Sequence, residues 1–140
     1  MLIPEEVRGK LESARVARLA TVDPNGAPHL IPVCFVFDGS VFYTGVDRKP
    51  KRAGHQLARL TNIETTPKVA LLVDEYCDDW ERLWYVLVRG TAARVTSDAE
   101  HQRAVVRLKT KYPQYAAGML DEGAPILRIT PQRITSWGKL

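Results

Sequence analysis

Four cationic residues lie within five positions of the chain: Arg48, Lys49, Lys51 and Arg52. They follow a β-branched and aromatic run at 41–46 and precede a segment whose apolar residues recur with helical spacing. Backbone N–H groups at a helix start, the helix dipole and cationic side chains can converge on one phosphate. A solvated turn and a nucleic-acid patch are the alternatives.

The neighbouring residues separate these possibilities. A duplex or single strand usually meets a broad basic stripe or a stacking platform. Acidic residues instead occur in the segments beside the cations: Asp47, Asp74, Glu75, Asp78 and Asp79. We therefore expect a single compact anion as the ligand and no nucleic-acid partner.

The sequence contains few other signals of a catalytic or metal-binding site. The chain has no GxGxxG, GxxxxGK[ST], GxSxG or HExxH motif, and its three histidines are far apart. We expect no metal site, and the catalytic groups stay unassigned. His29 opens a predicted strand near an edge, where an exposed strand-end histidine is favoured over a ligand contact. Cys34 and Cys77 form no CxxC pair and are interpreted as reduced, non-catalytic thiols.

The composition is that of one folded domain. The chain has 140 residues, of which 45% are hydrophobic and 26% charged, and we expect a single domain over 1–140. Its apolar runs are much shorter than the ~20 residues that span a bilayer, and its N-terminus lacks the apolar centre of a signal peptide. We expect a cytoplasmic protein with no membrane partner. The net charge of +4 favours anionic partners.

The first half of the sequence predicts a helix followed by three strands. Pro4 begins an amphipathic helix, and turn residues separate strands at 15–22, 29–37 and 41–46 into antiparallel hairpins. Pro32 cannot donate a hydrogen bond within a sheet, so the second strand must lie at an edge or bulge there.

The second half predicts two further helices, a possible extra turn after Pro113 and three strands. Leu60 and Ile63 share the apolar face of the helix after the cations, and Arg59 and Asn62 are expected to face away from it. Ser97 and Glu100 form a capping box, and Gly90 predicts a bulge. The further strands are expected at 68–76, 83–95 and 125–137. About six strands and a few short helices indicate an α+β, mainly β domain with a curved antiparallel sheet or small barrel.

The chain resembles a known family over essentially its whole length. The stretch "LATVDPNGAPHLIPVCFVFDGSVFYTGVD", the "KPK" after it and "LARLTNIETTPKVALLVDEY" are similar to the pyridoxamine 5'-phosphate oxidase-like FMN-binding split barrels. "DRKPKRAGHQLARLTNI", "DEYCDDWERLW" and "ITSW" resemble the actinobacterial branch of probable F420 (deazaflavin)-dependent enzymes. The resemblance implies a six-stranded antiparallel split β-barrel with short flanking helices, working as a homodimer with cofactor sites at the interface.

The resemblance also implies which residues bind the cofactor. The basic-x-Lys pattern of the phosphate site falls on Lys49 and Lys51, with Arg52 adjacent and Thr44 at the end of the third strand. The segment that lies along the cofactor ring in related proteins falls on Pro32, Val33 and Cys34. Trp80 or Trp84 is expected to close the site from the partner subunit.

The implied activity is hydride transfer between coenzyme F420 and a small electron-poor substrate, with Tyr43 as one possible proton source. Three hypotheses of function remain open: an F420-dependent reductase, an FMN-dependent oxidoreductase of the same fold, and a cofactor carrier without turnover. The anionic tail of F420 favours a basic groove more than compact FMN does. The end of the chain, "TPQRITSWGKL", lacks the Arg-x-His pattern of true pyridoxamine-phosphate oxidases, so vitamin B6 oxidation is not expected.

Overall fold

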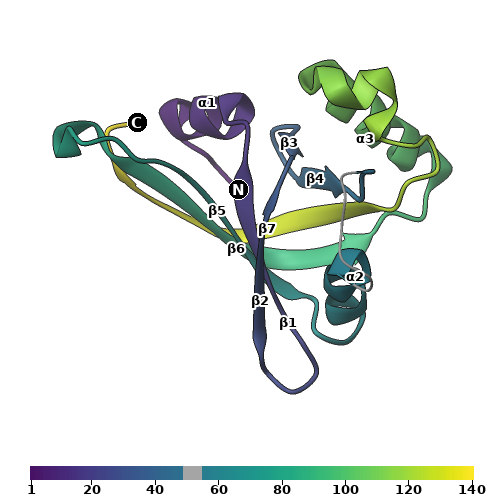
Figure 1. Cartoon of the computed structure of the whole chain (residues 1–140). Coiled ribbons are helices and arrows are strands. Elements are labelled where there is room, and N and C mark those ends of the chain that lie inside the picture. Colours follow the sequence, from purple (N-terminus) through teal and green to yellow (C-terminus); the bar gives the residue numbers. More distant parts are fainter. Residues whose placement is uncertain (49–54) are drawn as a thin grey trace.

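The protein is built on a strongly curled antiparallel sheet (Figure 1). The computed structural model describes residues 1–48 and 55–140, and this part of the chain contains seven strands in the order β2-β1-β5-β6-β7-β4-β3. The strands are β1 (Ala17–Val22), β2 (Pro28–Val33), β3 (Val36–Phe37), β4 (Phe42–Gly45), β5 (Lys68–Glu75), β6 (Trp84–Arg94) and β7 (Ile126–Gly138). The expected mainly β, antiparallel class is confirmed.

Short helical elements pack around this sheet. They are α1 (Glu5–Ser13), α2 (His55–Thr65), the 3-10 turn η1 (Trp80–Arg82), α3 (Asp98–Lys111) and the π turn η2 (Tyr115–Met119). The start of α3 follows the predicted capping box, since the Ser97 side chain accepts a hydrogen bond from the Glu100 backbone N–H at 3.3 Å. None of the helices in the described part of the chain is long and apolar enough to cross a bilayer.

The expected count of six strands was wrong because the predicted second strand, 29–37, is divided. Its first part is β2 and its last two residues are β3, and these lie at opposite edges of the sheet. Residues 34 and 35 therefore form a bend that carries the chain from one edge of the curled sheet to the other. Among the described strands β2 pairs only with β1, which confirms the edge position predicted from Pro32.

A bulge at Gly90 accompanies the curl of the long strands. The register between β6 and β7 shifts between Arg89 and Gly90, as the sequence predicts. A Cβ atom at Gly90 would lie 2.0 Å from the Thr130 carbonyl oxygen, so only glycine allows this approach of two backbones.

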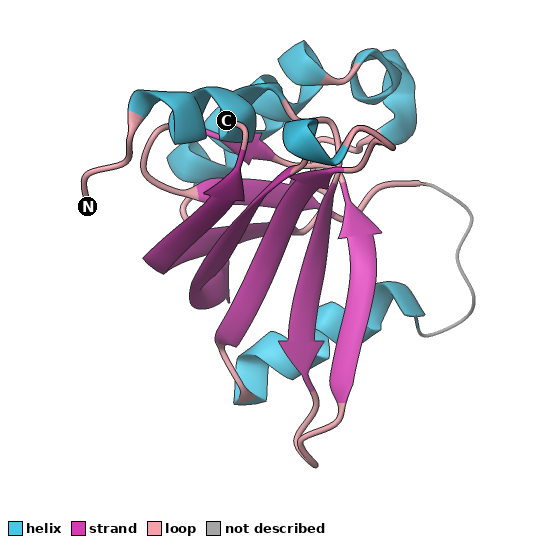
Figure 2. Cartoon of the chain, turned by 90° about the vertical axis from the view of Figure 1, so that its left-hand side faces the viewer, coloured by secondary structure: helices cyan, strands magenta, loops and turns pink. Residues whose placement is uncertain are grey.

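Two apolar clusters fill the inner side of the sheet. One lies among α1, α2 and the long strands and includes Leu11, Leu19 and Leu71; the other lies beneath α3 and η2 and includes Leu108 and Ile126. Figure 2 shows that none of the helices drawn covers the front face of the sheet. On this outer face Leu30 is 67% exposed, and Tyr85 stacks on Trp137 with ring centroids 6.0 Å apart.

Candidate cofactor site

The bend between β2 and β3 is held from two sides. The Thr44 hydroxyl, on β4, donates a 2.7 Å hydrogen bond to the Cys34 carbonyl oxygen. The Tyr112 hydroxyl accepts a 2.9 Å hydrogen bond from the Phe35 N–H and lies 2.9 Å from the Phe35 carbonyl oxygen. Burial raises the pKa of Tyr112 to about 12, so this hydroxyl stays protonated at neutral pH. Side chains thus replace the strand pairing that the backbone loses at the bend.

The three residues expected along the cofactor ring differ in their surroundings. Pro32 is exposed on the outer face of the edge strand, Val33 points into the core, and Cys34 is half-buried at the bend. Thr44 is only 1% exposed, so its hydroxyl secures the bend from inside. Lys49, Lys51 and Arg52 lie outside the described residues.

The chain entering the cationic segment is tied to the segment before β7. The Val46 N–H donates to the Pro125 carbonyl oxygen at 3.0 Å, and the Arg48 N–H donates to the Met119 carbonyl oxygen at 2.9 Å. The Arg48 side chain forms an ion pair with Asp121 at 2.5 Å. Arg48, the first of the four cations, therefore has a carboxylate partner within the chain.

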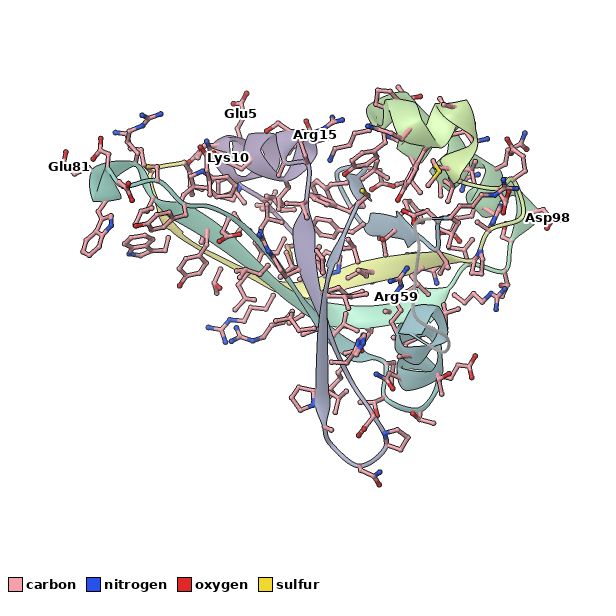
Figure 3. The ribbon with its side chains drawn as sticks, in the orientation of Figure 1. Glu5, Lys10, Arg15, Arg59, Glu81 and Asp98 are labelled. Atoms are coloured by element: carbon pink, nitrogen blue, oxygen red, sulfur yellow. The ribbon has the colours of Figure 1, made fainter. Side chains whose placement is uncertain are left out.

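A buried arginine that sequence analysis misplaced lies beneath this segment. Arg59 was expected to face away from the apolar side of its helix, but it is only 7% exposed and reaches from α2 toward the end of β4 (Figure 3). Its Nη2 lies 3.4 Å from the Gly45 carbonyl oxygen, and its Nε has no hydrogen-bond partner among the described residues. Burial lowers the pKa of Arg59, and Asp47 and Tyr115 oppose that shift.

Asn62 was likewise expected on the outside of α2 and is buried. Its side-chain amide donates a 3.0 Å hydrogen bond to the Thr21 hydroxyl on β1. The expectation failed because residues outside the apolar stripe of this helix also contact the sheet: Asn62 contacts Thr21 on β1, and Arg59 lies against the Gly45 carbonyl at the end of β4. Helical periodicity alone cannot reveal a second covered face.

Tyr115 and Asp47 add a further polar contact at the same place. The Tyr115 hydroxyl donates to a carboxylate oxygen of Asp47. Burial first, and then this hydrogen bond, raise the pKa of Tyr115. Together with the contacts of residues 46 and 48, this hydrogen bond orients the chain as it enters the cationic segment.

Lys111 is a functional candidate that sequence analysis missed. This residue ends α3, and its Nζ donates a 3.0 Å hydrogen bond to the Phe35 carbonyl oxygen while lying 4.2 Å above the Phe35 ring. Burial first, and then the nearby charge of Arg15, lower the pKa of Lys111 to about 8. No local motif could have found it, because Lys111 and Phe35 are 76 positions apart in the sequence.

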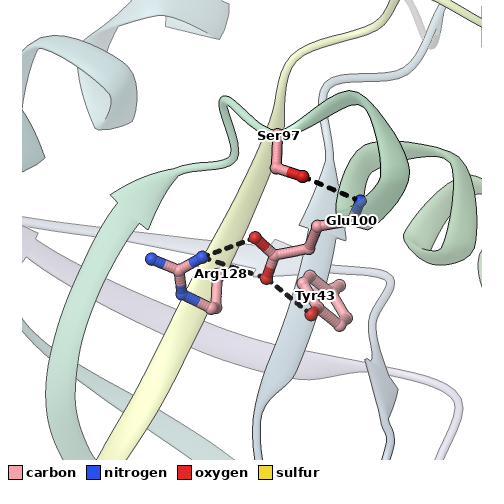
Figure 4. A network of polar contacts seen from close by, with 4 residues as sticks. All are labelled: Tyr43, Ser97, Glu100 and Arg128. Carbon is pink, nitrogen blue, oxygen red and sulfur yellow. Dashed lines mark hydrogen bonds and ion pairs between the residues drawn. The ribbon is translucent and has the colours of Figure 1, made fainter.

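Tyr43, proposed from the sequence as a possible proton source, takes part in a half-buried hydrogen-bond network. Its hydroxyl donates to Glu100 at 2.8 Å, and Glu100 also accepts two hydrogen bonds from Arg128, at 2.7 and 2.9 Å (Figure 4). Burial and the contact with Glu100 raise the pKa of Tyr43 to about 12. These contacts fasten the start of α3 to β4 and β7.

The two tryptophans expected near the site differ sharply. Trp84 is 5% exposed, its indole N–H donates to Glu75 at 3.3 Å, and Lys10 lies 4.9 Å above its ring. Trp80 is 72% exposed on η1. Of this pair, Trp80 presents the accessible ring.

His29 points to the inner side of β2, and its buried Nδ1 has no hydrogen-bond partner in the described part of the chain. In the described part of the chain no group of three His, Cys, Asp or Glu side chains is arranged to hold a metal ion.

A family model described as pyridoxamine 5'-phosphate oxidase matches residues 3–138. The chain belongs to this family. The resemblance seen in the sequence is thereby confirmed at the level of the pyridoxamine 5'-phosphate oxidase family, which covers nearly every residue described above.

One curated relative of the chain is a 5a,11a-dehydrotetracycline/5a,11a-dehydrooxytetracycline reductase from Streptomyces rimosus. It is 32% identical over 132 residues, which cover 91% of this chain and 78% of the relative. This chain is therefore similar to an oxidoreductase along almost all of its length.

Solved structures share the fold of this pyridoxamine 5'-phosphate oxidase family member. A conserved hypothetical protein from Mycobacterium tuberculosis is 25% identical, with a TM-score of 0.76 over 99% of this chain and 86% of that one. The heme storage protein HutZ from Vibrio cholerae is 18% identical, with a TM-score of 0.74 over 99% of this chain and 96% of that one. At such low identity the likeness to HutZ shows the fold alone.

Proposed function

We propose that this protein is an F420-dependent reductase, which transfers a hydride from the reduced deazaflavin to a small electron-poor substrate. The observation that carries the proposal is the 32% identity to a reductase over 91% of the chain. The resemblance of the cationic segment and of "DWERLW" to the F420 branch supports the choice of coenzyme. The whole chain, 1–140, forms the coenzyme-binding domain in this proposal.

The described residues fit such a coenzyme. In the sequence the cationic residues lie between β4 and the 11-residue helix α2, and in this proposal their side chains and the helix N-terminus bind one phosphate. β2 is an edge strand, and the outer side of an edge strand has backbone N–H and C=O groups available for the polar edge of a planar ring. Lys49, Lys51 and Arg52 would hold the phosphate, and Pro32 and Cys34 would lie beside the ring.

The residues of the chain bind and orient the coenzyme and the substrate, while the bound coenzyme would supply the hydride chemistry. Thr44 and Tyr112 fix the bend from inside, so the backbone beside the ring is held in one conformation. Asp47, Tyr115 and Arg59 lie where the chain enters the phosphate-binding segment. Such preorganisation reduces the ordering cost when the coenzyme binds.

The uncovered face of the sheet supports assembly as a homodimer with the coenzyme at the interface. A cavity of about 320 Å³ on this face is lined mainly by apolar residues of β1, β2, β5 and β6, including Ala20, Leu30 and Leu72. An ion pair of 2.8 Å between Arg18 and Asp74 lies at the same place. Leu30 and Pro32 point to the same side of β2, so the apolar face runs directly into the proposed ring site. A second copy of the chain would cover both.

The test is a parallel titration of the purified protein with oxidised F420 and with FMN, followed by quenching of each ligand's fluorescence. We expect tighter binding of F420, followed by oxidation of the reduced coenzyme when electron-poor acceptors are added. Preference for FMN would move the function to flavin oxidoreductases of the same fold. Tight F420 binding without turnover on any acceptor would indicate a cofactor carrier and not a reductase. Binding of neither ligand would refute the proposal.

A further inference from the structure

Two cations meet at the bend beside the proposed ring site. Arg15, in the link between α1 and β1, lies between α1 and α3, where its Nη2 donates a 2.8 Å hydrogen bond to the Lys111 carbonyl oxygen (Figure 3). Its guanidinium lies 4.9 Å from the centre of the Tyr112 ring. Lys111 reaches the bend with its Nζ 3.0 Å from the Phe35 carbonyl oxygen. Residues far apart in sequence thus bring two positive charges to one place.

Neither cation has an acidic partner among the described residues. The ion pairs between described side chains are Arg8–Glu12, Arg18–Asp74, Arg48–Asp121, Lys109–Glu122 and Arg128–Glu100. The groups that face the Lys111 ammonium are Arg15 from the α1–β1 link, Cys34 and Phe35 from the bend, and Tyr112, the residue that follows α3. An ammonium has three N–H donors, and Phe35 takes one of them. A half-buried positive charge without an acidic partner is stabilised when an anion binds beside it.

We propose that Lys111, supported by Arg15, forms an anion subsite that receives the carbonyl oxygen of a conjugated enone substrate, an assignment that rests on the reductase function proposed above. A hydride from the reduced deazaflavin adds to the β-carbon of the enone. The C=C π bond breaks, its electron pair forms a new π bond toward the carbonyl carbon, and the carbonyl π electrons move to oxygen. The enolate oxygen then takes a proton from the Lys111 ammonium, and the enol returns to the ketone in water, which also reprotonates the lysine.

The neighbouring hydroxyls are less suited to this step. Tyr43 donates to Glu100, and Tyr112 is engaged by the Phe35 backbone; burial raises the pKa of each to about 12. An acid works best when its pKa lies near the working pH, and the Lys111 pKa of about 8 meets that condition. The cationic form of Lys111 also stabilises the oxygen charge as it develops.

The first experiment measures the subsite without turnover. 4-Nitrophenolate, whose charge is delocalised onto oxygen like that of an enolate, is titrated by difference absorbance into the coenzyme-free and the F420-loaded protein. We expect Lys111→Met to weaken binding by about tenfold or more, as loss of a charge-assisted hydrogen bond predicts. Lys109→Met, on the same helix but paired with Glu122, is the matched control and should bind like the wild type. Equal binding by all three proteins, or no binding by the wild type, would overturn the proposal.

The second experiment follows the pH dependence of kcat/KM with reduced F420 and 2-cyclohexen-1-one. We expect the wild type to lose activity as pH rises through about 8, where Lys111 loses its proton. Lys111→Arg keeps the charge to higher pH and should lose this alkaline limb, whereas Lys111→Met should fall on the order of 10²-fold. The proposed proton transfer from Lys111 would be contradicted if Lys111→Arg kept the alkaline limb of the pH profile unchanged. It would also be contradicted if the wild type bound both F420 and nitrophenolate but showed no turnover.

Measuring the affinity for F420 distinguishes a failure of the anion-subsite proposal from a failure of the proposed reductase function. Wild-type and Lys111→Met proteins should bind F420 equally, because the phosphate site does not include Lys111. Failure of both to bind F420 refutes the reductase function, and the nitrophenolate titration of the coenzyme-free protein still reports on the anion subsite.

Discussion

The Thr44 hydroxyl donates a 2.7 Å hydrogen bond to the carbonyl oxygen of Cys34, and so joins β4 to the bend at which the chain passes between the two edges of the sheet. The carbonyl has left the strand ladder at this point, and Thr44 supplies its partner from the core. This one contact links the stability of the fold to the shape of the proposed ring site.

Replacing Thr44 with valine should therefore destabilise the protein. The change keeps the size of the side chain but leaves the Cys34 carbonyl without this donor, which is expected to lower the free energy of unfolding by about 1–3 kcal/mol. Urea denaturation followed by tryptophan fluorescence measures the loss. Thr44→Ser retains the hydroxyl and is the control; a valine variant as stable as the serine variant would show that the hydrogen bond is unimportant.

Replacing Lys51 with alanine should weaken coenzyme binding. Charge-assisted hydrogen bonds to phosphate contribute more than ~1 kcal/mol, so the Kd for F420 should rise at least about fivefold. The fluorescence titration described above measures it. Lys68→Ala, which removes an exposed lysine at the start of β5, is the control for the loss of one positive charge. Unchanged affinity in Lys51→Ala would remove this residue from the phosphate site.

Replacing Leu30 with lysine should break the proposed dimer. Leu30 is exposed on β2 and lines the cavity of the uncovered face, and a charge there would be desolvated in an interface. We expect the dimer Kd to rise by tenfold or more, about 1.4 kcal/mol, in sedimentation velocity measurements. Val106→Lys alters another exposed apolar residue, on α3, and should leave the dimer intact. A monomeric wild type would reject the proposed interface.

The Glu100 network should make stability depend on pH in the acid range. Hydrogen bonds from Tyr43 and Arg128 lower the pKa of Glu100 below its ordinary value of 4.5. A carboxylate with a lowered folded-state pKa stabilises the fold above its unfolded pKa, and this contribution disappears as pH falls through the folded value. Glu100→Gln should thus be less stable than the wild type at pH 7, and the difference should shrink as the pH falls below the ordinary pKa.

Urea midpoints at several pH values between 7 and 3 measure this change. The Ser97 hydroxyl accepts its hydrogen bond from the backbone N–H of residue 100, so Glu100→Gln keeps this cap while removing the carboxylate charge. Glu64→Gln, an exposed residue of α2, should show no such convergence. A constant difference between Glu100→Gln and the wild type across the range would exclude the carboxylate as its source.

Much of the local structure followed from the sequence because its causes are local. Pro32 placed its strand at an edge, Gly90 marked the bulge, and Ser97 with Glu100 marked the start of α3. Each of these signals depends on the backbone chemistry of a few adjacent residues. The family resemblance, carried by stretches along the whole chain, likewise needed no coordinates.

The tertiary structure decided which residues distant in sequence lie side by side across the curled sheet. It divided the predicted second strand at Cys34, covered Arg59 and Asn62, and brought Arg15 and Lys111 to the same bend although 96 positions separate them. Periodicity reports one apolar face of an element, but not whether a second element covers the other face. The sequence therefore pointed to the family and to the proposed phosphate-binding segment, whereas the proposed anion subsite depends on long-range packing that only the folded chain reveals.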